Sequence, residues 1–258
     1  ARAGVELAGV VARDPLADAA VRCVRAMAAG FAGDRAAAAI NAEDISARVG
    51  GATSYADAGL ALLAAYGLAA TGEPQAASAL LRRGSGGAAL PLLPLALRAY
   101  GFDMLIEAAL ADGDTELAAW MLSDLNRLDF GGNEHLLAAR DAARTRVRIA
   151  TGDGAGDAPH ARAATISALG TGSALVAARA ALAAALAAEV SAPPSSRVGL
   201  VSAVRAEDLR AWLLRSIASA DEKAEDRAAW GRLTRTQRTV ARLAARGMRN
   251  HEIADLLV

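Results

Sequence analysis

Four glycines that are each followed by an acidic residue recur at intervals of 39, 41 and 39 residues, and this spacing constrains the fold most strongly. The pairs are Gly33-Asp34, Gly72-Glu73, Gly113-Asp114 and Gly152-Asp153. A glycine can end one helix in a left-handed conformation, and an acidic residue in the first turn of the next helix faces the positive end of the helix dipole. We therefore expect each interval to hold one pair of helices, with successive pairs stacked as in helical-repeat proteins.

Small or apolar side chains follow the first three glycines at a fixed distance. They stand four and five positions after each glycine, as Ala37 and Ala38, Ala76 and Ala77, and Leu117 and Ala118. Close packing between stacked helices requires such side chains at the contact. The fourth copy departs from the pattern, because further glycines follow Gly152-Asp153. We expect a longer loop there and a helix that starts near Asp157.

The apolar content of the chain favours helices over sheets. Hydrophobic residues make up 54% of the sequence but aromatic residues only 3%, so alanine and leucine dominate the apolar content. Alanine and leucine are strong helix formers, whereas sheets draw on β-branched and aromatic residues. The sequence therefore predicts an all-α fold, with helix-pair repeats forming a superhelix over residues 1–190.

Two consecutive prolines, Pro193 and Pro194, mark the end of the repeat region, because proline cannot continue a helix. We expect residues 191–232 to form a linker and connecting helices. Four apolar residues of this stretch are spaced to share one helical face: Leu209, Trp212, Leu213 and Ile217. The pattern favours Trp212 as a core anchor over a binding role.

The last segment, residues 233–258, predicts two short helices around a glycine turn. Thr234 and Gln237 have the spacing of a capping box, in which the hydroxyl and the side-chain amide each pair with a backbone N–H at the helix start. Gly247 ends this helix, and Asn250 is a natural N-cap for the next. Apolar residues at helical spacing complete both helices: Val240, Leu243, Ala244, Ile253, Leu256 and Leu257.

This segment resembles the start of a LuxR-type helix-turn-helix DNA-binding domain. The usual family pattern opens with Leu-Thr-x-Arg-Glu-x-x-Val-Leu and continues with a glycine and Asn-x-Glu-Ile-Ala. The matching residues here are Leu233, Thr234, Val240, Gly247, Asn250, Glu252, Ile253 and Ala254. Gln237 replaces the usual glutamate, which keeps the capping chemistry, and Arg235 replaces the usual proline or serine.

The resemblance implies a role for the basic end of the chain. Residues 230–258 contain six arginines against Glu252 and Asp255, within a chain whose formal net charge is zero. Arg249, Asn250 and His251 become candidate contacts to DNA phosphates at a helix N-terminus. The family's recognition helix follows this segment, so we expect the chain to be a fragment that holds only the scaffold on the phosphate side.

The arrangement of the whole chain is also similar to the large LuxR regulators of the ATP-dependent, MalT-like kind, in which a TPR-like superhelix precedes the DNA-binding domain. The resemblance implies that the repeats sense an inducer or a regulatory protein and that the full-length protein binds double-stranded DNA. No Gly-x-x-x-x-Gly-Lys-Ser/Thr loop occurs here, so any ATP-binding module is expected upstream of this chain. We expect no cofactor within it; an oligomer remains possible.

The remaining residues favour neither a metal site nor an enzyme. Cys23 is the one cysteine, and it stands in an apolar helical stretch where a buried structural thiol is expected. The three histidines are widely separated, so zinc and nucleophile-base arrangements are not expected. No stretch has the roughly 20 apolar residues of a membrane span, and a cytoplasmic location is expected. The alternative function is a helical-repeat scaffold that binds proteins without binding DNA.

Overall fold

The computed structural model describes residues 15–49, 54–152, 165, 174–189, 209, 211–218, 222, 234, 237, 240 and 241. The chain divides into two compact units, residues 1–215 and 216–258. The regular secondary structure of the described residues is helical, with no β-strand among them, which confirms the all-α prediction for this part of the chain. In the same part of the chain, each helix is too short or too polar to cross a membrane.

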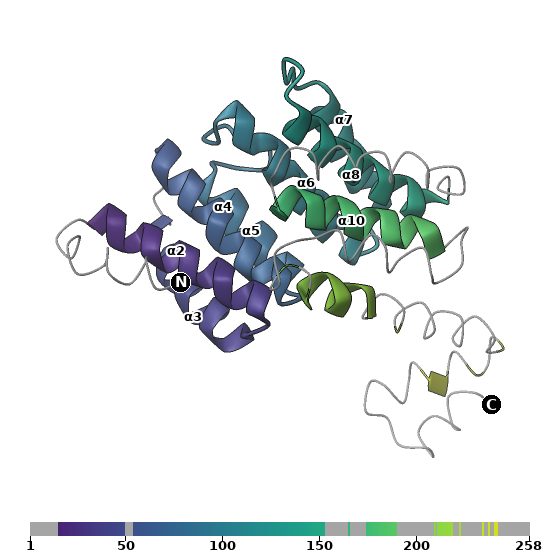
Figure 1. Cartoon of the computed structure of the whole chain (residues 1–258), viewed down its shortest axis with the longest axis horizontal. Coiled ribbons are helices and arrows are strands. Elements are labelled where there is room, and N and C mark those ends of the chain that lie inside the picture. The colour runs from purple at the N-terminus through teal and green to yellow at the C-terminus, as the bar shows by residue number, and fades with distance from the viewer. Residues whose placement is uncertain are drawn as a thin grey trace. The chain divides into compact units, whose positions relative to one another are not determined.

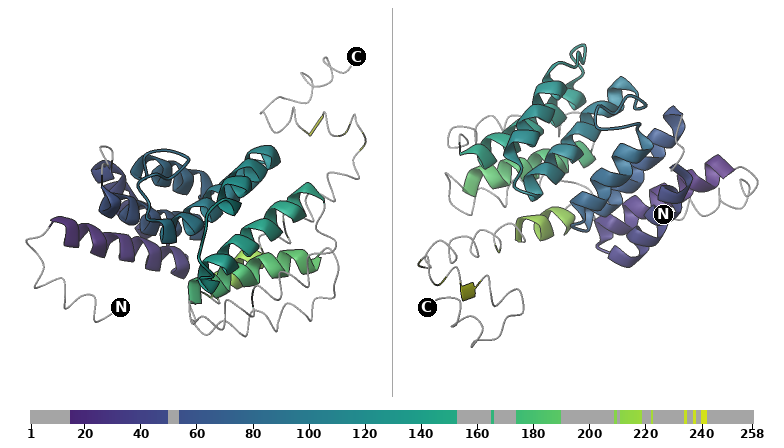
Figure 2. Two further views of the ribbon diagram at one scale, coloured as in Figure 1. Left: turned by 90° about the horizontal axis from the view of Figure 1, so that it is seen from above. Right: turned by 180° about the vertical axis from the view of Figure 1, so that it is seen from behind.

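The first unit consists of helices that follow one another in antiparallel pairs (Figure 1). The helices are α2 (Pro15–Ala32), α3 (Arg35–Arg48), α4 (Tyr55–Ala70), α5 (Pro74–Gly84), α6 (Leu95–Ala111), α7 (Thr115–Asn126), α8 (Glu134–Thr151) and α10 (Ala174–Glu189). Within the pairs, α2 packs on α3, α4 on α5, and α6 on α7. Each second helix also contacts the first helix of the next pair, as α3 contacts α4, α5 contacts α6, and α7 contacts α8. The pairs therefore stack in chain order, which Figure 2 shows from two further sides.

The same turn joins the two helices of the first three pairs. Gly33, Gly72 and Gly113 have φ angles of 86°, 83° and 77°, in the left-handed region that suits glycine. The N–H of the acidic residue after each glycine donates to the carbonyl five residues earlier, with N···O distances of 2.8–3.1 Å. These two features define a Schellman ending of the first helix. The predicted role of the glycines is confirmed, and Gly152 ends α8 in the same conformation.

The acidic residues differ in position from the expectation, because they are the N-caps of the second helices and not members of the first turn. Asp34 Oδ1 accepts a hydrogen bond from the N–H of Ala37, and Asp114 Oδ1 accepts one from the N–H of Leu117, each at 2.9 Å. Glu73 makes no such side-chain cap and forms an ion pair with Arg35. An aspartate side chain therefore caps the N-terminus of the second helix in two of the three pairs.

Replacing Asp114 with alanine is expected to destabilise the first unit by about 1 kcal/mol, the usual cost of losing an N-cap side chain. Glu73→Ala is the matched control, because Glu73 occupies the equivalent position without a capping hydrogen bond. Its exposed ion pair contributes little, on the order of 0–1 kcal/mol. Urea unfolding of the two variants measures both changes. Equal losses would contradict the assignment of the capping role to Asp114.

Only half of the predicted small-residue contacts lie in the core. Ala38, Ala77 and Ala118, five positions after each glycine, are fully buried. The residues one position earlier are partly or well exposed, and Leu117 remains 37% exposed. Adjacent residues of a helix point about 100° apart, so only one of the two can face the contact. The longer loop and the helix start expected near Asp157 lie outside the described residues.

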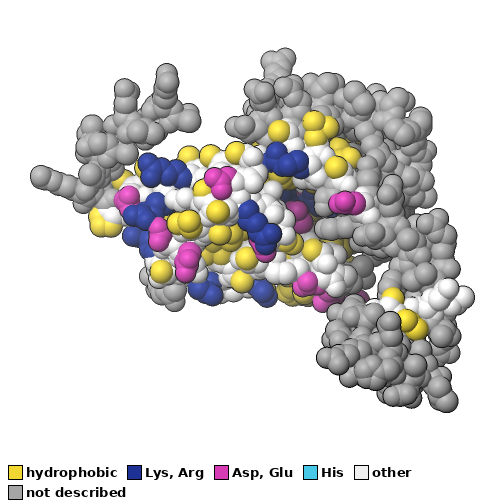
Figure 3. All heavy atoms as spheres, turned by 90° about the horizontal axis from the view of Figure 1, so that it is seen from below, with side chains coloured by type: hydrophobic (Ala, Val, Ile, Leu, Met, Phe, Trp, Pro, Cys, Tyr) yellow, Lys and Arg dark blue, Asp and Glu magenta, His cyan; other side chains and the backbone are white. Residues whose placement is uncertain are grey.

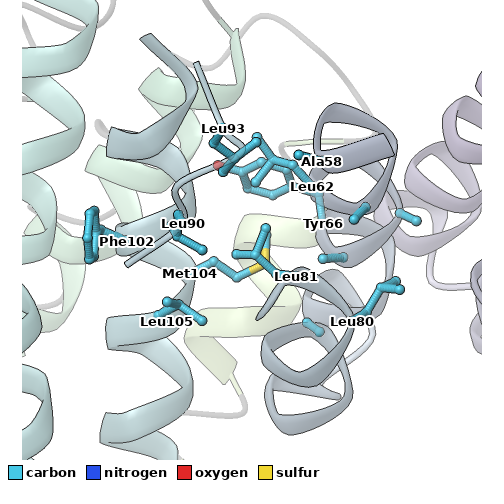
Figure 4. Packing of buried hydrophobic residues seen from close by; sticks show 14 of the residues in the cluster. Ala58, Leu62, Tyr66, Leu80, Leu81, Leu90, Leu93, Phe102, Met104 and Leu105 are labelled. Carbon is cyan, nitrogen blue, oxygen red and sulfur yellow. The ribbon is translucent and has the colours of Figure 1, made fainter. Parts of the chain in front are cut away.

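The core of the first unit lies between the stacked pairs. Figure 4 shows leucine and methionine side chains from α4, α5, α6 and the α5–α6 connection around a common centre. The largest fully buried side chains here include Leu81, Leu90, Leu93, Met104 and Leu105. Where α2 crosses α4, Gly30 and Gly67 allow the two backbones to meet directly. Small residues thus set the distance between the first two pairs.

Trp212 is a core residue, as predicted from the sequence. Its side chain is 4% exposed, and its ring meets the ring of Phe31 edge-on at a centroid distance of 5.5 Å. Helical residues 211–215 therefore belong to the first compact unit, although they follow the proline pair of the sequence. The division between the two units falls after Arg215, inside the range 191–232 that was expected to act as a linker.

Candidate functional site

The most unusual feature of the first unit is a set of charged side chains buried between its helices. We call it the Asp103 cluster and define it as Tyr66, Asp103, Glu107, Arg146 and Arg179. Its members come from four helices: α4, α6, α8 and α10. Asp103, Arg146 and Arg179 are 1%, 8% and 6% exposed. Charged side chains are rarely buried to this extent unless they are paired.

Asp103 is the centre of the cluster because each of its oxygens faces a different arginine. Arg179 Nε donates to Asp103 Oδ2 at 2.5 Å, and Arg146 Nη2 forms an ion pair with Asp103 Oδ1. The second terminal nitrogen of Arg179, Nη2, donates to Glu107 Oε2 at 2.8 Å. Asp103 and Glu107 are four residues apart on α6, so they share one face of that helix. The four charged groups balance when all are ionised.

The aromatic ring of Tyr66 lies against the Arg179 side chain of the cluster. The guanidinium carbon of Arg179 lies 5.5 Å from the centroid of the Tyr66 ring, within the range of a cation–π contact. The Tyr66 hydroxyl is buried and has no hydrogen-bond partner among the residues that the structure describes. The ring therefore favours the cation beside it, while the buried hydroxyl is unfavourable.

Burial and neighbouring charges shift the ionisation of these groups. Burial raises the pKa of Tyr66 to about 12, although the Arg179 guanidinium acts in the opposite direction. Burial and the like charge of Arg179 lower the pKa of Arg146. Burial would also lower the pKa of Arg179, but Glu107 and Tyr66 raise it above its ordinary value. The charged form of Arg179 is therefore stabilised more strongly by its neighbours than the charged form of Arg146.

This arrangement holds helices together and leaves neither carboxylate free of an arginine. Both carboxylates are engaged by guanidinium groups, so neither is placed as a free acid or base. Within the ranges that the structure describes, no three His, Cys, Asp or Glu side chains come together as a metal site would need. The cluster instead ties α6 to α8 and α10, so a change at one helix alters the contacts of the others.

Sequence reasoning did not find the Asp103 cluster. A signal was present, since Asp103 interrupts the apolar run Gly101–Ile106 and Arg179 interrupts an alanine-rich run. A charge within a continuous apolar run of a helix indicates a buried partner of opposite sign. The sequence does not predict which residue is the partner, because Asp103 and Arg179 are 76 positions apart in the chain.

Cys23 is buried, in agreement with the expected structural thiol. Its Sγ donates to the carbonyl of Leu60 at 3.2 Å, a contact between α2 and α4. Burial raises the pKa of the Cys23 thiol to about 12. The thiol is therefore kept in its unreactive, protonated form at neutral pH.

Replacing Tyr66 with phenylalanine is expected to leave stability at neutral pH unchanged or raised by about 1 kcal/mol, since it removes an unpartnered buried hydroxyl. The substitution should also remove a decrease in the free energy of unfolding at alkaline pH. The pKa of Tyr66 is raised in the folded state, so the stabilisation by its protonated hydroxyl is fully present below the ordinary pKa of about 10 and is lost as the pH rises towards 12. A shift of this size corresponds to about 2–3 kcal/mol.

The measurement is urea unfolding of both proteins between pH 7 and pH 11. The matched control is Tyr55→Phe, which changes a tyrosine of the same helix that is 66% exposed. The control should follow the unmodified protein over the whole range. A Tyr66→Phe protein that loses stability above pH 10 as steeply as the control would contradict the assignment.

The predicted residues of the terminal segment are described in part. Thr234 and Gln237 exchange the two hydrogen bonds of a capping box: the N–H of Gln237 donates to Thr234 Oγ1 at 3.2 Å, and the N–H of Thr234 donates to Gln237 Oε1 at 2.8 Å. Arg249, Asn250 and His251 lie outside the described residues. The capping box predicted from the sequence is therefore confirmed.

On the face of the molecule seen in Figure 3, arginine and acidic side chains of the described residues are interspersed with apolar ones. A nucleic-acid backbone favours a surface of one sign of charge, which this face does not offer.

Comparison with family models, curated proteins and solved structures finds no match for this chain.

Proposed function

We propose that this chain is part of a DNA-binding transcription regulator of the LuxR type. The repeats form a TPR-like superhelix that senses an inducer or a regulatory protein. Residues 233–258 form the beginning of the helix-turn-helix domain. The observation behind this proposal is the ordered match from Leu233 to Ala254, whose first helix starts with the Thr234–Gln237 capping box.

The chemistry of the terminal segment supports DNA as the partner. Arg249, Asn250 and His251 precede the apolar face of the second predicted helix, where backbone N–H groups and a positive dipole end favour phosphate. Contacts of this kind position a protein on the duplex, and the recognition helix then reads base edges in the major groove. In LuxR-type domains that helix would follow Val258.

The repeats support a sensing role through their construction. Successive helix pairs form surfaces suited to ligands and proteins, and the Asp103 cluster links several pairs. By the same resemblance, an upstream ATP-binding module and a cytoplasmic location belong to the proposal. No catalytic step is assigned to the chain.

The test is titration of the natural full-length protein with fluorescent duplex DNA at several salt concentrations. The logarithm of the binding constant should fall with that of the salt concentration, with a slope of about −0.9 for each neutralised phosphate. Arg249→Ala should weaken binding and reduce the slope by about one. Arg127→Ala is the matched control, because Arg127 is an exposed arginine at the C-cap of α7 that pairs with Asp124. Absent or salt-independent binding would overturn the proposal.

One observation favours the alternative of a protein-binding scaffold. Ile40 and Trp120 stand at the same place in their repeats, six residues after the N-cap aspartate, and are 63% and 50% exposed. Exposed apolar side chains at equivalent repeat positions are typical of a protein-binding surface. The scaffold function predicts no salt-dependent affinity for duplex DNA, so the same titration separates the two.

A further inference from the structure

We propose that Arg179 fixes the position of α10 along its own axis, and that the apolar packing of this helix alone would admit a second position one turn away. We call the two positions the observed and the shifted register. The sequence of α10, the burial of its central residues and the contacts of Arg179 together support this proposal. It concerns the helices of the first unit and is independent of the function proposed above.

The middle of α10 repeats its own sequence after one helical turn. Residues 180–184 read Ala-Ala-Leu-Ala-Ala, and residues 184–188 read the same. A step of four residues is about 6 Å along a helix and about 40° more than a full turn. If α10 moved by this step towards its N-terminus, residues 184–188 would take the places of 180–184 with identical side chains. The apolar side chains of 180–184 therefore do not distinguish the two registers.

This part of α10 is enclosed by its neighbours. The side chains of 178–184 are all buried, and seven consecutive residues cover every side of a helix. The contact with α8, which lies beside α10 in Figure 1, involves small side chains from both helices: Ala138, Ala142, Ala180 and Ala183. Cores packed from uniform side chains lose a unique arrangement before they lose stability. The alanine contacts therefore stabilise α10 but specify its register weakly.

Arg179 is the one charged residue among residues 174–188. Its Nε donates to Asp103 Oδ2 at 2.5 Å, and its Nη2 donates to Glu107 Oε2 at 2.8 Å. The planar fork of a guanidinium cannot keep both hydrogen bonds after a step of about 6 Å. Ala183 would take the place of Arg179 in the shifted register, and a buried charge without its partners is strongly unfavourable. The two carboxylates of α6 therefore select the observed register.

A second difference between the registers lies at Ala178, which is fully buried. The step would bring Leu182 to this place, and a larger side chain in a filled site is unfavourable. Packing at Ala178 and pairing of Arg179 thus both favour the observed register. Substitution of Arg179 alone separates the two contributions.

The test is Arg179→Met, which keeps an unbranched side chain and removes the charge. Asp103 still faces Arg146 in this variant. Glu107 loses its contact with Arg179, but its side chain is 27% exposed and can be hydrated. The variant therefore leaves a paired charge at the centre of the cluster and removes the contacts that hold α10.

The measurement is NMR of the whole chain with its alanine methyl groups labelled with carbon-13. In the unmodified protein, Ala180 and Ala183 should each give one methyl resonance, with nuclear Overhauser effects to the alanines of α8. In Arg179→Met, both should split into two resonances, the new one with about 10% or more of the intensity. Ala187 should then gain Overhauser effects to the α8 alanines that Ala183 contacts.

The matched control is Arg146→Met, which removes the other buried arginine of the cluster and leaves both hydrogen bonds of Arg179 in place. The alanine resonances of α10 should remain single in this variant. Circular dichroism at 222 nm checks that both variants are folded. If Arg179→Met does not fold, Arg179→Lys takes its place, because an ammonium lacks the fork that reaches both carboxylates and should also give a second set of resonances.

A double variant tests the shifted register directly. Leu186→Ala removes the leucine that would take the place of Leu182, so adding it to Arg179→Met should restore a single set of resonances. A single set in Arg179→Met itself would overturn the proposal and assign the register to packing at Ala178. Equal splitting in Arg146→Met would also overturn it, because loss of any buried arginine would then loosen α10.

Discussion

Replacing Asp103 with asparagine is expected to destabilise the first unit by about 3–5 kcal/mol, because the substitution leaves two buried guanidinium groups without their shared carboxylate. Arg146 depends most on this carboxylate, since burial and the charge of Arg179 already lower its pKa. Arg179 keeps its contact with Glu107. The measurement is the free energy of unfolding in urea, followed by circular dichroism at 222 nm.

Two further variants distinguish the cost of leaving a buried charge unpaired from the cost of lost packing. Glu107→Gln is the matched carboxylate control, because the Glu107 side chain is 27% exposed and contacts a single arginine of the cluster. It should cost about 1 kcal/mol. Exchange of Asp103, Arg146 and Arg179 together for apolar residues of similar volume should recover most of the stability, since such replacements are often neutral. A cost below about 1 kcal/mol for Asp103→Asn would contradict the central role of this carboxylate.

Replacing Gly67 with alanine is expected to cost about 3 kcal/mol or more, because its new methyl group would collide with the backbone of α2. The added Cβ would lie 2.3 Å from the carbonyl oxygen of Ala26. Backbone atoms cannot move aside as a flexible side chain can, so α2 and α4 would have to separate. Gly30→Ala should have a similar effect, since its Cβ would lie 2.2 Å from the carbonyl oxygen of Gly67.

The matched control is Gly59→Ala, in the same helix. A Cβ at Gly59 meets nothing within 4 Å, so alanine should stabilise by about 0.5–1 kcal/mol through its helix propensity. The two substitutions therefore have opposite expected signs in one helix. Urea midpoints and slopes of the variants test this directly. A Gly67→Ala protein as stable as Gly59→Ala would show that α2 and α4 do not meet backbone to backbone.

The local parts of the fold were predicted correctly from the sequence. The Gly33, Gly72 and Gly113 turns end their helices as expected, because a left-handed glycine and a following acidic cap act within one turn of chain. The capping box of Thr234 and Gln237 depends on residues only three apart. The acidic residues were placed one position too far into their helices, a difference that glycine spacing alone does not resolve.

The candidate DNA contacts remain predictions. Arg249, Asn250 and His251 follow from the LuxR resemblance, and the TPR-like description of the superhelix, the inducer and the upstream ATP-binding module have the same origin. The buried cluster around Asp103 was not foreseen, because a charge in an apolar run indicates that a partner exists without indicating which one.

The sequence by itself determined the helical class, the repeated turns and their caps, since these depend on propensities and contacts between residues a few positions apart. Tertiary structure decided the direct approach of Gly30 to Gly67, the pairing of Asp103 with Arg146 and Arg179, and the docking of Trp212 on Phe31. Each of these joins residues 37 to 181 positions apart, with the partner chosen by packing of the whole unit. No local pattern encodes that choice, because many buried positions could accept the same side chain.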